Sequence, residues 1–328
     1  MDNISDYVNN YTSTQSNSET SSNCTHSATD FLIKVYFLPA MYSIIFIIGF
    51  PGNIIAISIY IVKMRPWRTS IIILFNLAIT DLLHLSSLPF LVFNYANQEH
   101  WTLGDFMCKL IRIVFHFNLY GSILFLTCFS IFRYFVIVHP MKFHSIHKRR
   151  WAVIACAAVW VIAIIEILPM VFLMTEIQDT VACVDFAVSL KMYNLRWYNA
   201  FLTSVGFALP LVVVTLCYTS INVSLANGPY TNDDYKKKAR KLVIILLVVF
   251  YACFLPLHIL RAIRIETRLY KVECFYEAYI HAVYIASRPI ASLNTFGNLL
   301  LYVAVGGNFQ QAIQSVYKCK NPSYKQQK

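Results

Sequence analysis

Seven long apolar stretches, separated by short polar segments, dominate the pattern of hydrophobic and polar positions along the chain. An α-helix needs about 20 mostly apolar residues to cross the hydrocarbon core of a bilayer. Stretches of this kind lie near residues 35–62, 69–96, 106–138, 150–174, 197–225, 240–263 and 279–305. Proline falls within several of them, which membrane helices tolerate better than soluble helices do. The pattern therefore predicts an all-α membrane protein, a seven-transmembrane-helix bundle over residues 35–305.

A polar tail precedes the expected bundle. Residues 1–34 are rich in Asn, Ser and Thr and contain three N-glycosylation sequons, at Asn3, Asn10 and Asn23. These asparagines can be glycosylated only if this end of the chain reaches the secretory lumen. A tail of this composition also produces sequons by chance. Three of them ahead of a first membrane helix favour an extracellular, glycosylated tail.

A second polar segment, residues 306–328, follows the bundle. It opens with two glycines, and Phe309, Ile313 and Val316 then recur at helical spacing. Such spacing predicts a short amphipathic eighth helix on the inner face of the membrane, ahead of a cytoplasmic tail.

The distribution of Lys and Arg predicts the orientation of the bundle. Basic residues concentrate after the first, third and fifth apolar stretches, for example Lys63, Lys142 and Lys236, whereas the N-terminal tail carries Asp and Glu. Because cytoplasmic loops are enriched in Lys and Arg, the N-terminus is expected outside and the C-terminus in the cytoplasm. We expect a multi-pass protein of the plasma membrane.

Composition agrees with a membrane protein and disfavours other classes. Of the 328 residues, 58% are hydrophobic and 13% are charged, whereas soluble domains carry about 25% charged residues. The net charge of +11 could suggest nucleic acid, but no long basic run lies outside the short loops, so we expect no nucleic-acid partner. The sequence contains no metal-ligand cluster, nucleophile motif or phosphate-binding loop, so we expect neither an enzyme nor a cofactor.

Four of the nine cysteines fall on the expected outer side. They are Cys24, Cys108, Cys183 and Cys274. An even number in an oxidising compartment predicts two disulfide bonds, and four cysteines allow three pairings. The residues alone do not choose among these pairings.

Several short motifs occur in order along the seven stretches. They are Gly52-Asn53, Leu77-Ala78 with Asp81, Phe132-Arg133-Tyr134, Trp160, Pro210 with Tyr218, Phe250 with Pro256, and Asn298 with Tyr302. Each is weak alone, but together they resemble the rhodopsin-like (class A) G-protein-coupled receptors across residues 35–318. The resemblance implies a receptor that activates a heterotrimeric G protein, expected here to be of the Gq class, with arrestin as a further partner.

A finer resemblance is carried by residues 116–120, 257–264 and 287–298. They are similar to the nucleotide-receptor-like branch of the family and, within it, to the receptors for 2-oxoglutarate and succinate. This resemblance also implies the disulfide pairing, which joins Cys108 to Cys183 and Cys24 to Cys274.

Three positions depart from the pattern of the family. Phe132 stands where an Asp usually precedes the arginine of the third helix, so Arg133 lacks an adjacent carboxylate. Phe254 replaces the usual Trp two residues before Pro256, which excludes a Trp-based switch. Leu299 replaces the usual Pro after Asn298, so helix seven should bend less at this point.

Ionisable groups inside a membrane are costly, so each is a functional hypothesis. Arg133 ends the third helix on the cytoplasmic side, where a snorkelling arginine is the alternative reading. With Tyr134 and the resemblance, we expect it to act in G-protein coupling, and the resemblance adds Tyr218 and Tyr302.

Asp81 lies in the middle of the second helix and needs a cation or polar partners. The resemblance places Ser122, Asn294 and Asn298 around a sodium ion at this aspartate, and all three offer the oxygen ligands that a hard cation prefers. The alternative is a water-linked polar network without an ion.

The outer half of the bundle carries the ligand hypothesis. Arg112 and His116 are four residues apart on one face of the third helix, and Arg261 and Arg288 lie in the outer halves of the sixth and seventh helices. We expect these four residues to form a cationic cage for a small dicarboxylate, most readily 2-oxoglutarate. The resemblance adds Tyr42 and Tyr95 to the cavity.

Other ligands and another class of protein stay open. Succinate- or itaconate-like acids, a nucleotide or a leukotriene are the alternative ligands. For Arg264 and Arg268, snorkelling to the membrane surface is as good a reading as ligand binding. A dicarboxylate transporter would also need membrane arginines, but the sequence shows no internal repeat.

Overall fold

The computed structural model describes residues 31–140, 149–174, 192–227, 233–270 and 272–305, and all regular structure in these ranges is helical. The first four membrane helices closely follow the apolar stretches of the sequence. They are η1 with α3 (Ile33–Phe37 and Leu38–Val62), α4 (Thr69–Ala96), α5 (Gly104–Val138) and α7 (Arg149–Met174). The expected tail over residues 1–30, its sequons and the eighth helix lie outside the described residues.

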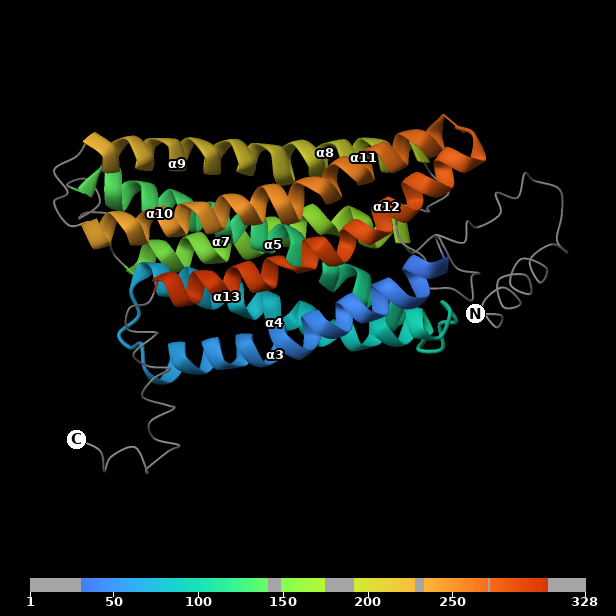
Figure 1. The fold of residues 1–328 in the computed structure, drawn as a ribbon, viewed down its shortest axis with the longest axis horizontal. Coiled ribbons are helices and arrows are strands. Elements are labelled where there is room, and N and C mark those ends of the chain that lie inside the picture. The colour runs from blue at the N-terminus through green and yellow to red at the C-terminus, as the bar shows by residue number, and fades with distance from the viewer. Residues whose placement is uncertain (1–30, 141–148, 175–191, 228–232, 271, 306–328) are drawn as a thin grey trace, which may run out of the picture.

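Each of the last three membrane helices consists of consecutive segments. The fifth comprises α8, η3 and α9 (Met192–Thr203, Ser204–Ala208 and Leu209–Asn227), the sixth α10, η4 and α11 (Asp233–Val248, Val249–Phe254 and Leu255–Leu269), and the seventh α12 and α13 (Cys274–Ser292 and Asn294–Val305). Six helices within the described ranges are long and apolar enough to cross a membrane, and the seventh is divided at Leu293. The expected seven-helix bundle is confirmed (Figure 1).

Three helices begin earlier than the apolar pattern predicts. The fifth begins at Met192 rather than at 197, the sixth at Asp233 rather than at 240, and the seventh at Cys274 rather than at 279. Polar residues such as Asn194, Asp233 and Glu277 occur in these first turns. Hydropathy marks only the part of a helix that lies in hydrocarbon, whereas backbone hydrogen bonds extend the helix beyond it.

Helix α5 lies at the centre of the bundle. It contacts α4, α7 and α9, while α11 packs on α12 and α8. The last helix closes the bundle, because α13 packs on both α10 and α3. The helices run side by side along the long axis of the molecule (Figure 1).

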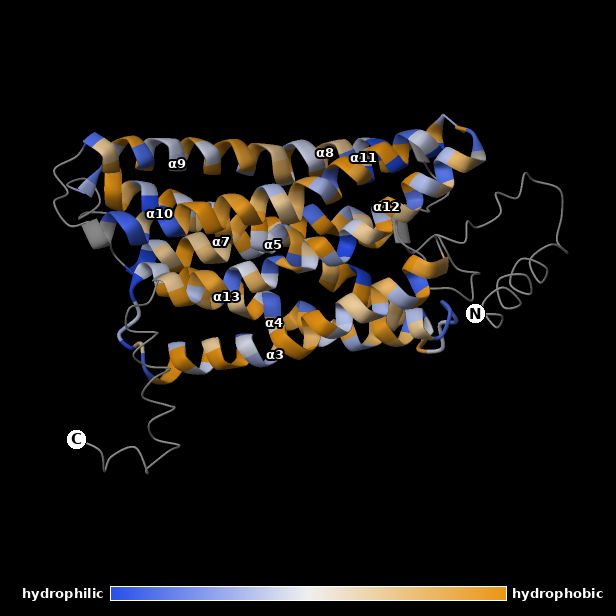
Figure 2. Ribbon diagram, viewed as in Figure 1, coloured by the Kyte–Doolittle hydropathy of each residue, from blue (hydrophilic) through white to orange (hydrophobic). Residues whose placement is uncertain are grey.

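The outer surface of the bundle is apolar and several polar side chains are inside. Ile47, Ile165 and Leu216 are 66%, 59% and 62% exposed, whereas Asp81 and Asn298 are fully buried. Hydrophobic residues accordingly cover the middle of the helices in Figure 2, and hydrophilic residues gather towards the ends. This distribution suits a bilayer, where apolar side chains face the lipid and polar groups need partners inside the protein.

A wide π-helical segment precedes a proline in three helices. Ile33–Phe37, Ser204–Ala208 and Val249–Phe254 are followed by Pro39, Pro210 and Pro256. Proline has no N–H group, and its ring clashes with the carbonyl group four residues earlier. An extra residue in the preceding turn relieves this clash.

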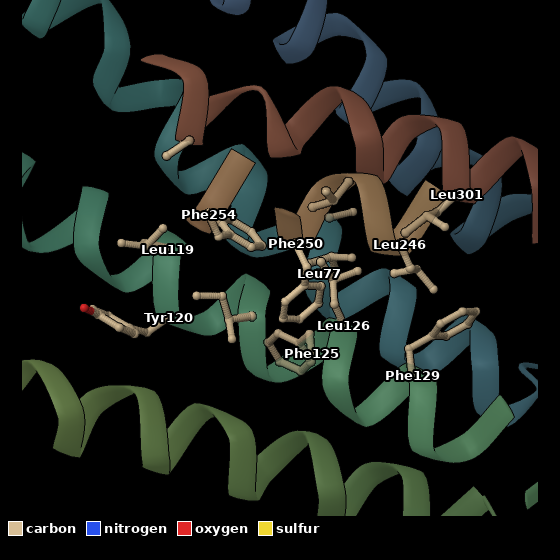
Figure 3. Close-up of a cluster of buried hydrophobic side chains, with 14 of the residues drawn as sticks. Leu77, Leu119, Tyr120, Phe125, Leu126, Phe129, Leu246, Phe250, Phe254 and Leu301 are labelled. Carbon is tan, nitrogen blue, oxygen red and sulfur yellow. The ribbon is translucent and has the colours of Figure 1, made fainter. Parts of the chain in front are cut away.

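A cluster of buried hydrophobic side chains fills the middle of the bundle (Figure 3). Phe250 and Phe254 of η4 are fully buried, and their ring centroids lie 5.6 Å apart in an edge-to-face arrangement. Phe254, which stands where the family usually has Trp, is therefore part of the core.

Candidate functional site

Three arginines from three helices are buried in the half of the bundle that we expect to face outside. Arg112 lies on α5, Arg261 on α11 and Arg288 on α12, and they are 7%, 1% and 6% exposed. The charges of all three act on the buried side chain of His116. The structure thus brings together the four residues of the predicted cage.

Arg261 is held by polar side chains of two helices. Its Nη2 donates to the hydroxyl of Tyr120 on α5 at 2.7 Å and to Nδ1 of His258 at 3.1 Å. His258 in turn stacks on Phe207, with ring centroids 4.3 Å apart. These contacts fix the guanidinium between the third and sixth helices and leave its charge in place, because a hydroxyl and an imidazole are neutral acceptors.

Arg288 lies among tyrosines. Its Nη1 donates to the hydroxyl of Tyr95 at 3.4 Å, and its guanidinium carbon lies 5.0 Å from the ring centroid of Tyr284. Tyr95 stacks on Tyr42, with centroids 6.3 Å apart. Tyr42 and Tyr95, which the resemblance placed in the cavity, therefore lie next to Arg288.

His116 hydrogen-bonds to its own helix. Its Nδ1 lies 2.9 Å from the carbonyl oxygen of Arg112 and can only donate to it, because a carbonyl oxygen is an acceptor. The hydrogen bond orients the ring along the face that also carries Arg112.

Arginines closer to the end of the bundle form ion pairs. Arg264 Nη1 lies 2.9 Å from Glu277 Oε1, and Arg268 Nε lies 3.9 Å from the same oxygen. Arg196 similarly pairs with Glu266 at 2.8 Å. For Arg264 and Arg268 the sequence left both snorkelling and ligand binding open. In the structure both side chains lie against the carboxylate of Glu277 on α12.

Asp81 accepts hydrogen bonds from α5 and α13. Asn118 donates to Oδ1 at 3.1 Å, and Asn298 and the hydroxyl of Tyr302 donate to Oδ2 at 2.9 and 3.3 Å. Ser122 joins this network through Asn118, which lies 3.4 Å from its hydroxyl. Asn294 lies four residues before Asn298 and is buried. Its amide atoms have no hydrogen-bond partner among the described residues.

Arg133 lies near the opposite end of α5. Its guanidinium carbon is 5.1 Å from the ring centroid of Phe129, and it lines a cavity of about 220 Å³ together with Tyr218 and Lys238. The Tyr218 hydroxyl is 2.7 Å from Ser130 Oγ.

The other two predicted coupling residues have different neighbours. Tyr134 hydrogen-bonds to His139 Nε2 at 3.1 Å, and Tyr302 contacts Asp81. Of the predicted coupling residues, only Arg133 and Tyr218 therefore share the cavity.

Only some of the four cysteines in the predicted disulfide bonds belong to the described residues. Cys108 is disulfide-bonded, while Cys183 and Cys24 lie outside the described residues and the side chain of Cys274 is not described. The pairing stays a prediction. Four further cysteines of the helices are free thiols, namely Cys128, Cys156, Cys217 and Cys253.

Sequence reasoning missed four residues that support the site. They are Asn118, Tyr120, His258 and Tyr284. Helical spacing could have found each of them, because every one lies three or four residues from a predicted site residue and hence on the same helix face.

Comparisons with known proteins agree with this architecture. The model of the family described as 7 transmembrane receptor (rhodopsin family) matches residues 52–302. Mouse 2-oxoglutarate receptor 1 is 60% identical over 300 residues, which cover 91% of this chain and 88% of that receptor, and the rat receptor of that name is 59% identical over equal shares. A purinoceptor from mouse is 36% identical over 286 residues, covering 85% of this chain and 77% of that receptor.

Proposed function

The chain belongs to the rhodopsin family of seven-transmembrane receptors, and from this premise we propose that it is a receptor for 2-oxoglutarate. It is a multi-pass membrane protein that works as a G-protein-coupled receptor and not as an enzyme. One observation carries the choice of ligand, namely the convergence of Arg112, Arg261 and Arg288 around His116.

The chemistry of these groups favours a small dianion. A guanidinium group binds a carboxylate through two parallel hydrogen bonds. Arginines on α5, α11 and α12 can hold the two ends of one dicarboxylate, with Tyr42, Tyr95 and Tyr120 supplying neutral hydroxyls. A ligand shifts a conformational equilibrium only if it contacts the two states differently. A dianion that bridges three helices meets this condition, because its contacts depend on the distances between them.

We place this cage on the extracellular side, with the N-terminus outside and a tail glycosylated at Asn3, Asn10 and Asn23. The excess of Lys and Arg in the segments at the opposite end supports this orientation. The cavity beside Arg133 and Tyr218 is then cytoplasmic and accepts the G protein, which we take to be of the Gq class. Arrestin would bind at the same end.

The polar network around Asp81 fits a sodium ion. Besides the carboxylate, Asn294 Oδ1 and Asn298 Oδ1 are buried oxygens without hydrogen-bond partners among the described residues, and Ser122 adds a hydroxyl. Oxygen ligands of this kind suit a hard cation. Asp81, Ser122, Asn294 and Asn298 would hold the ion, whose charge would offset the buried carboxylate.

A panel of ligands tests the proposed function. Cells that express the chain should answer 2-oxoglutarate with a calcium rise and at a lower concentration than succinate, itaconate, nucleotides or leukotrienes, with cyclic AMP recorded in parallel. Radiolabelled 2-oxoglutarate should not accumulate in these cells, since accumulation would indicate a transporter. A nucleotide that is far more potent than any dicarboxylate would overturn the proposal.

A further inference from the structure

A second group of cations surrounds a cavity at the opposite end of the bundle from the arginine cage. The cavity measures about 350 Å³ and is lined by Lys63, Arg65, Arg68 and Arg149, with Trp67 and Thr69 among its other lining residues. Three of the cations come from the segment between α3 and α4, and the fourth is the first residue of α7. The segment after α3 is hydrophilic and lies at one end of the molecule (Figures 1 and 2).

Nothing acidic is available in these loops to neutralise the four charges. Residues 63–70 and 139–151 contain neither Asp nor Glu, and the first turns of α4 and α7 carry no acidic residue. Within the described ranges, none of the four cations takes part in an ion pair. Four like charges around one cavity repel one another, so a bound anion would stabilise the arrangement.

The backbone adds to the attraction for anions. Arg68 is the N-cap of α4, and its side chain makes no capping hydrogen bond. The first N–H groups of a helix have no partner within the helix and carry part of the positive end of its dipole. They face the same end of the bundle as the four side chains.

Hydrophobic surface next to the cavity favours a lipid over a soluble anion. Val62, which directly precedes Lys63, is 70% exposed, and Trp151 and Ile154 near the start of α7 are 52% and 56% exposed. Trp67 is fixed beside the cations, because its indole N–H donates to the Tyr60 carbonyl oxygen at 2.7 Å and Arg65 lies 5.4 Å over its ring. Acyl chains can therefore run along α3 and α7 while the headgroup enters the cavity.

We propose that this cavity binds the phosphorylated headgroup of an inositol lipid from the cytoplasmic leaflet. Basic pockets between membrane helices on the cytoplasmic side suit such headgroups. Four cations call for more than one phosphate, and a volume of about 350 Å³ exceeds what a single phosphate needs. The inference rests on the proposed orientation of the bundle, but it is independent of the identity of the agonist.

The full-length chain in nanodiscs provides the test. Binding of a fluorescent phosphatidylinositol 4,5-bisphosphate should be stronger than binding of phosphatidylserine at equal total charge. The variant Arg65→Gln, Arg68→Gln, Arg149→Gln should weaken it by roughly a hundredfold, because each cation near an anionic lipid surface contributes about a factor of five. Replacing the same three arginines by Lys should preserve most of the binding.

A matched control loses the same charge elsewhere on that side. Lys236→Gln, Lys237→Gln, Arg240→Gln changes side chains of α10 that do not line the cavity, and it should reduce binding only slightly. If the two variants lost lipid binding equally, the binding would depend on the overall positive charge of this side and not on the cavity. That result would overturn the proposal. Soluble inositol trisphosphate that binds as tightly as the lipid would also overturn it, in favour of a soluble ligand.

Orientation and folding are measured separately. Arg65→Cys should react with a membrane-impermeant maleimide only after cells are permeabilised, and reaction on intact cells would refute both the orientation and this lipid site. Agonist binding by the Gln variant reports whether the outer half is still folded. If 2-oxoglutarate is not the agonist but the lipid results hold, only the proposed ligand of the outer cage fails.

Discussion

The arginines at the end of the bundle that we assign to the outside fall into two groups that differ in their neighbours. Arg264 and Arg268 face the carboxylate of Glu277, so an incoming anion would compete with an existing ion pair. Arg261 and Arg288 instead contact hydroxyl groups, an imidazole and an aromatic ring. Neutral acceptors such as these orient a guanidinium without cancelling its charge.

Replacing an arginine of the cage should weaken agonist binding strongly. Arg112→Ala or Arg288→Ala should each cost about 2–5 kcal/mol of agonist affinity, as expected for truncating one side of a buried charge pair. Arg288→Lys should rescue only partly, because an ammonium group does not provide the two parallel hydrogen bonds. Concentration–response curves and radioligand binding at equal surface expression measure the effect.

An arginine at the end of the bundle provides the control. Arg196→Ala removes a cation whose side chain is 39% exposed and pairs with Glu266, and water and salt screen such an exposed pair, so it contributes little. Agonist affinity should hardly change. Arg112 and Arg288 variants that respond like the wild type would show that the cage does not bind the agonist.

The hydroxyl of Tyr120 should matter through Arg261. Tyr120→Phe keeps the ring but removes the 2.7 Å hydrogen bond, and a hydrogen bond to a charged group contributes about 1.5–3 kcal/mol. The agonist can take over the freed donor, so we expect a loss of roughly tenfold in affinity, smaller than that of the arginine variants. Tyr279→Phe, at a side chain that is 61% exposed on α12, should have no effect. Equal responses of the two variants would contradict this role.

At the scale of the helices, glycines set how closely two neighbours approach. A Cβ atom on Gly297 of α13 would overlap Val249 Cγ2 of η4, whereas one on Gly121 of α5 would lie at an ordinary 3.6 Å from Thr80 Cγ2. Gly297→Ala should therefore destabilise the protein by about 1–3 kcal/mol through overpacking. Thermal unfolding of the purified receptor measures this loss.

Two further variants make the test specific. Gly121→Ala should leave the midpoint of thermal unfolding nearly unchanged, and Val249→Ala should restore part of the stability of the Gly297→Ala variant because it removes the clashing methyl group. If Gly297→Ala unfolds at the same temperature as the wild type, α13 and η4 are not packed as closely as described.

The helices could be predicted from the sequence much better than the contacts between them. Apolar length and the distribution of Lys and Arg depend on each segment separately, so α4 follows its predicted stretch at both ends. The partners of Asp81 and Arg261 depend on which helices meet and at which height. Asn118 and Tyr120 were missed for this reason, although each lies on the same helix face as a predicted residue.

The same reasoning explains why some predicted site residues have neighbours that the sequence did not indicate. Tyr302, which the resemblance adds to the coupling residues, lies against Asp81 and, edge-to-face, against Tyr60. Asn294 is buried as expected and is not among the donors to Asp81. Periodicity gives the face of a helix, whereas these contacts depend on the interruption at Leu293, which the sequence did not reveal.

At the scale of the whole molecule, one helix carries both functional ends. Arg112 and Arg133 both lie on α5, and a rise of about 1.5 Å per residue separates them by about 30 Å. Between them, Asp81 joins α4 to α5 and α13 through Asn118 and Asn298. An agonist that moves α5 relative to α11 and α12 therefore acts on the helix that also lines the cavity beside Arg133.

Arg133→Ala should consequently separate binding from signalling. Because the side chain lies about 30 Å from the cage, radiolabelled agonist should still bind, with affinity changed by no more than the coupling between the two ends, about 1–3 kcal/mol. The calcium response should disappear, since the variant removes the cation from the cavity that we assign to the G protein. Lys238→Ala is the matched variant, because it deletes another cation of that cavity, and it should only weaken the response. Loss of agonist binding by Arg133→Ala at normal surface expression would mean that this arginine supports the fold rather than coupling.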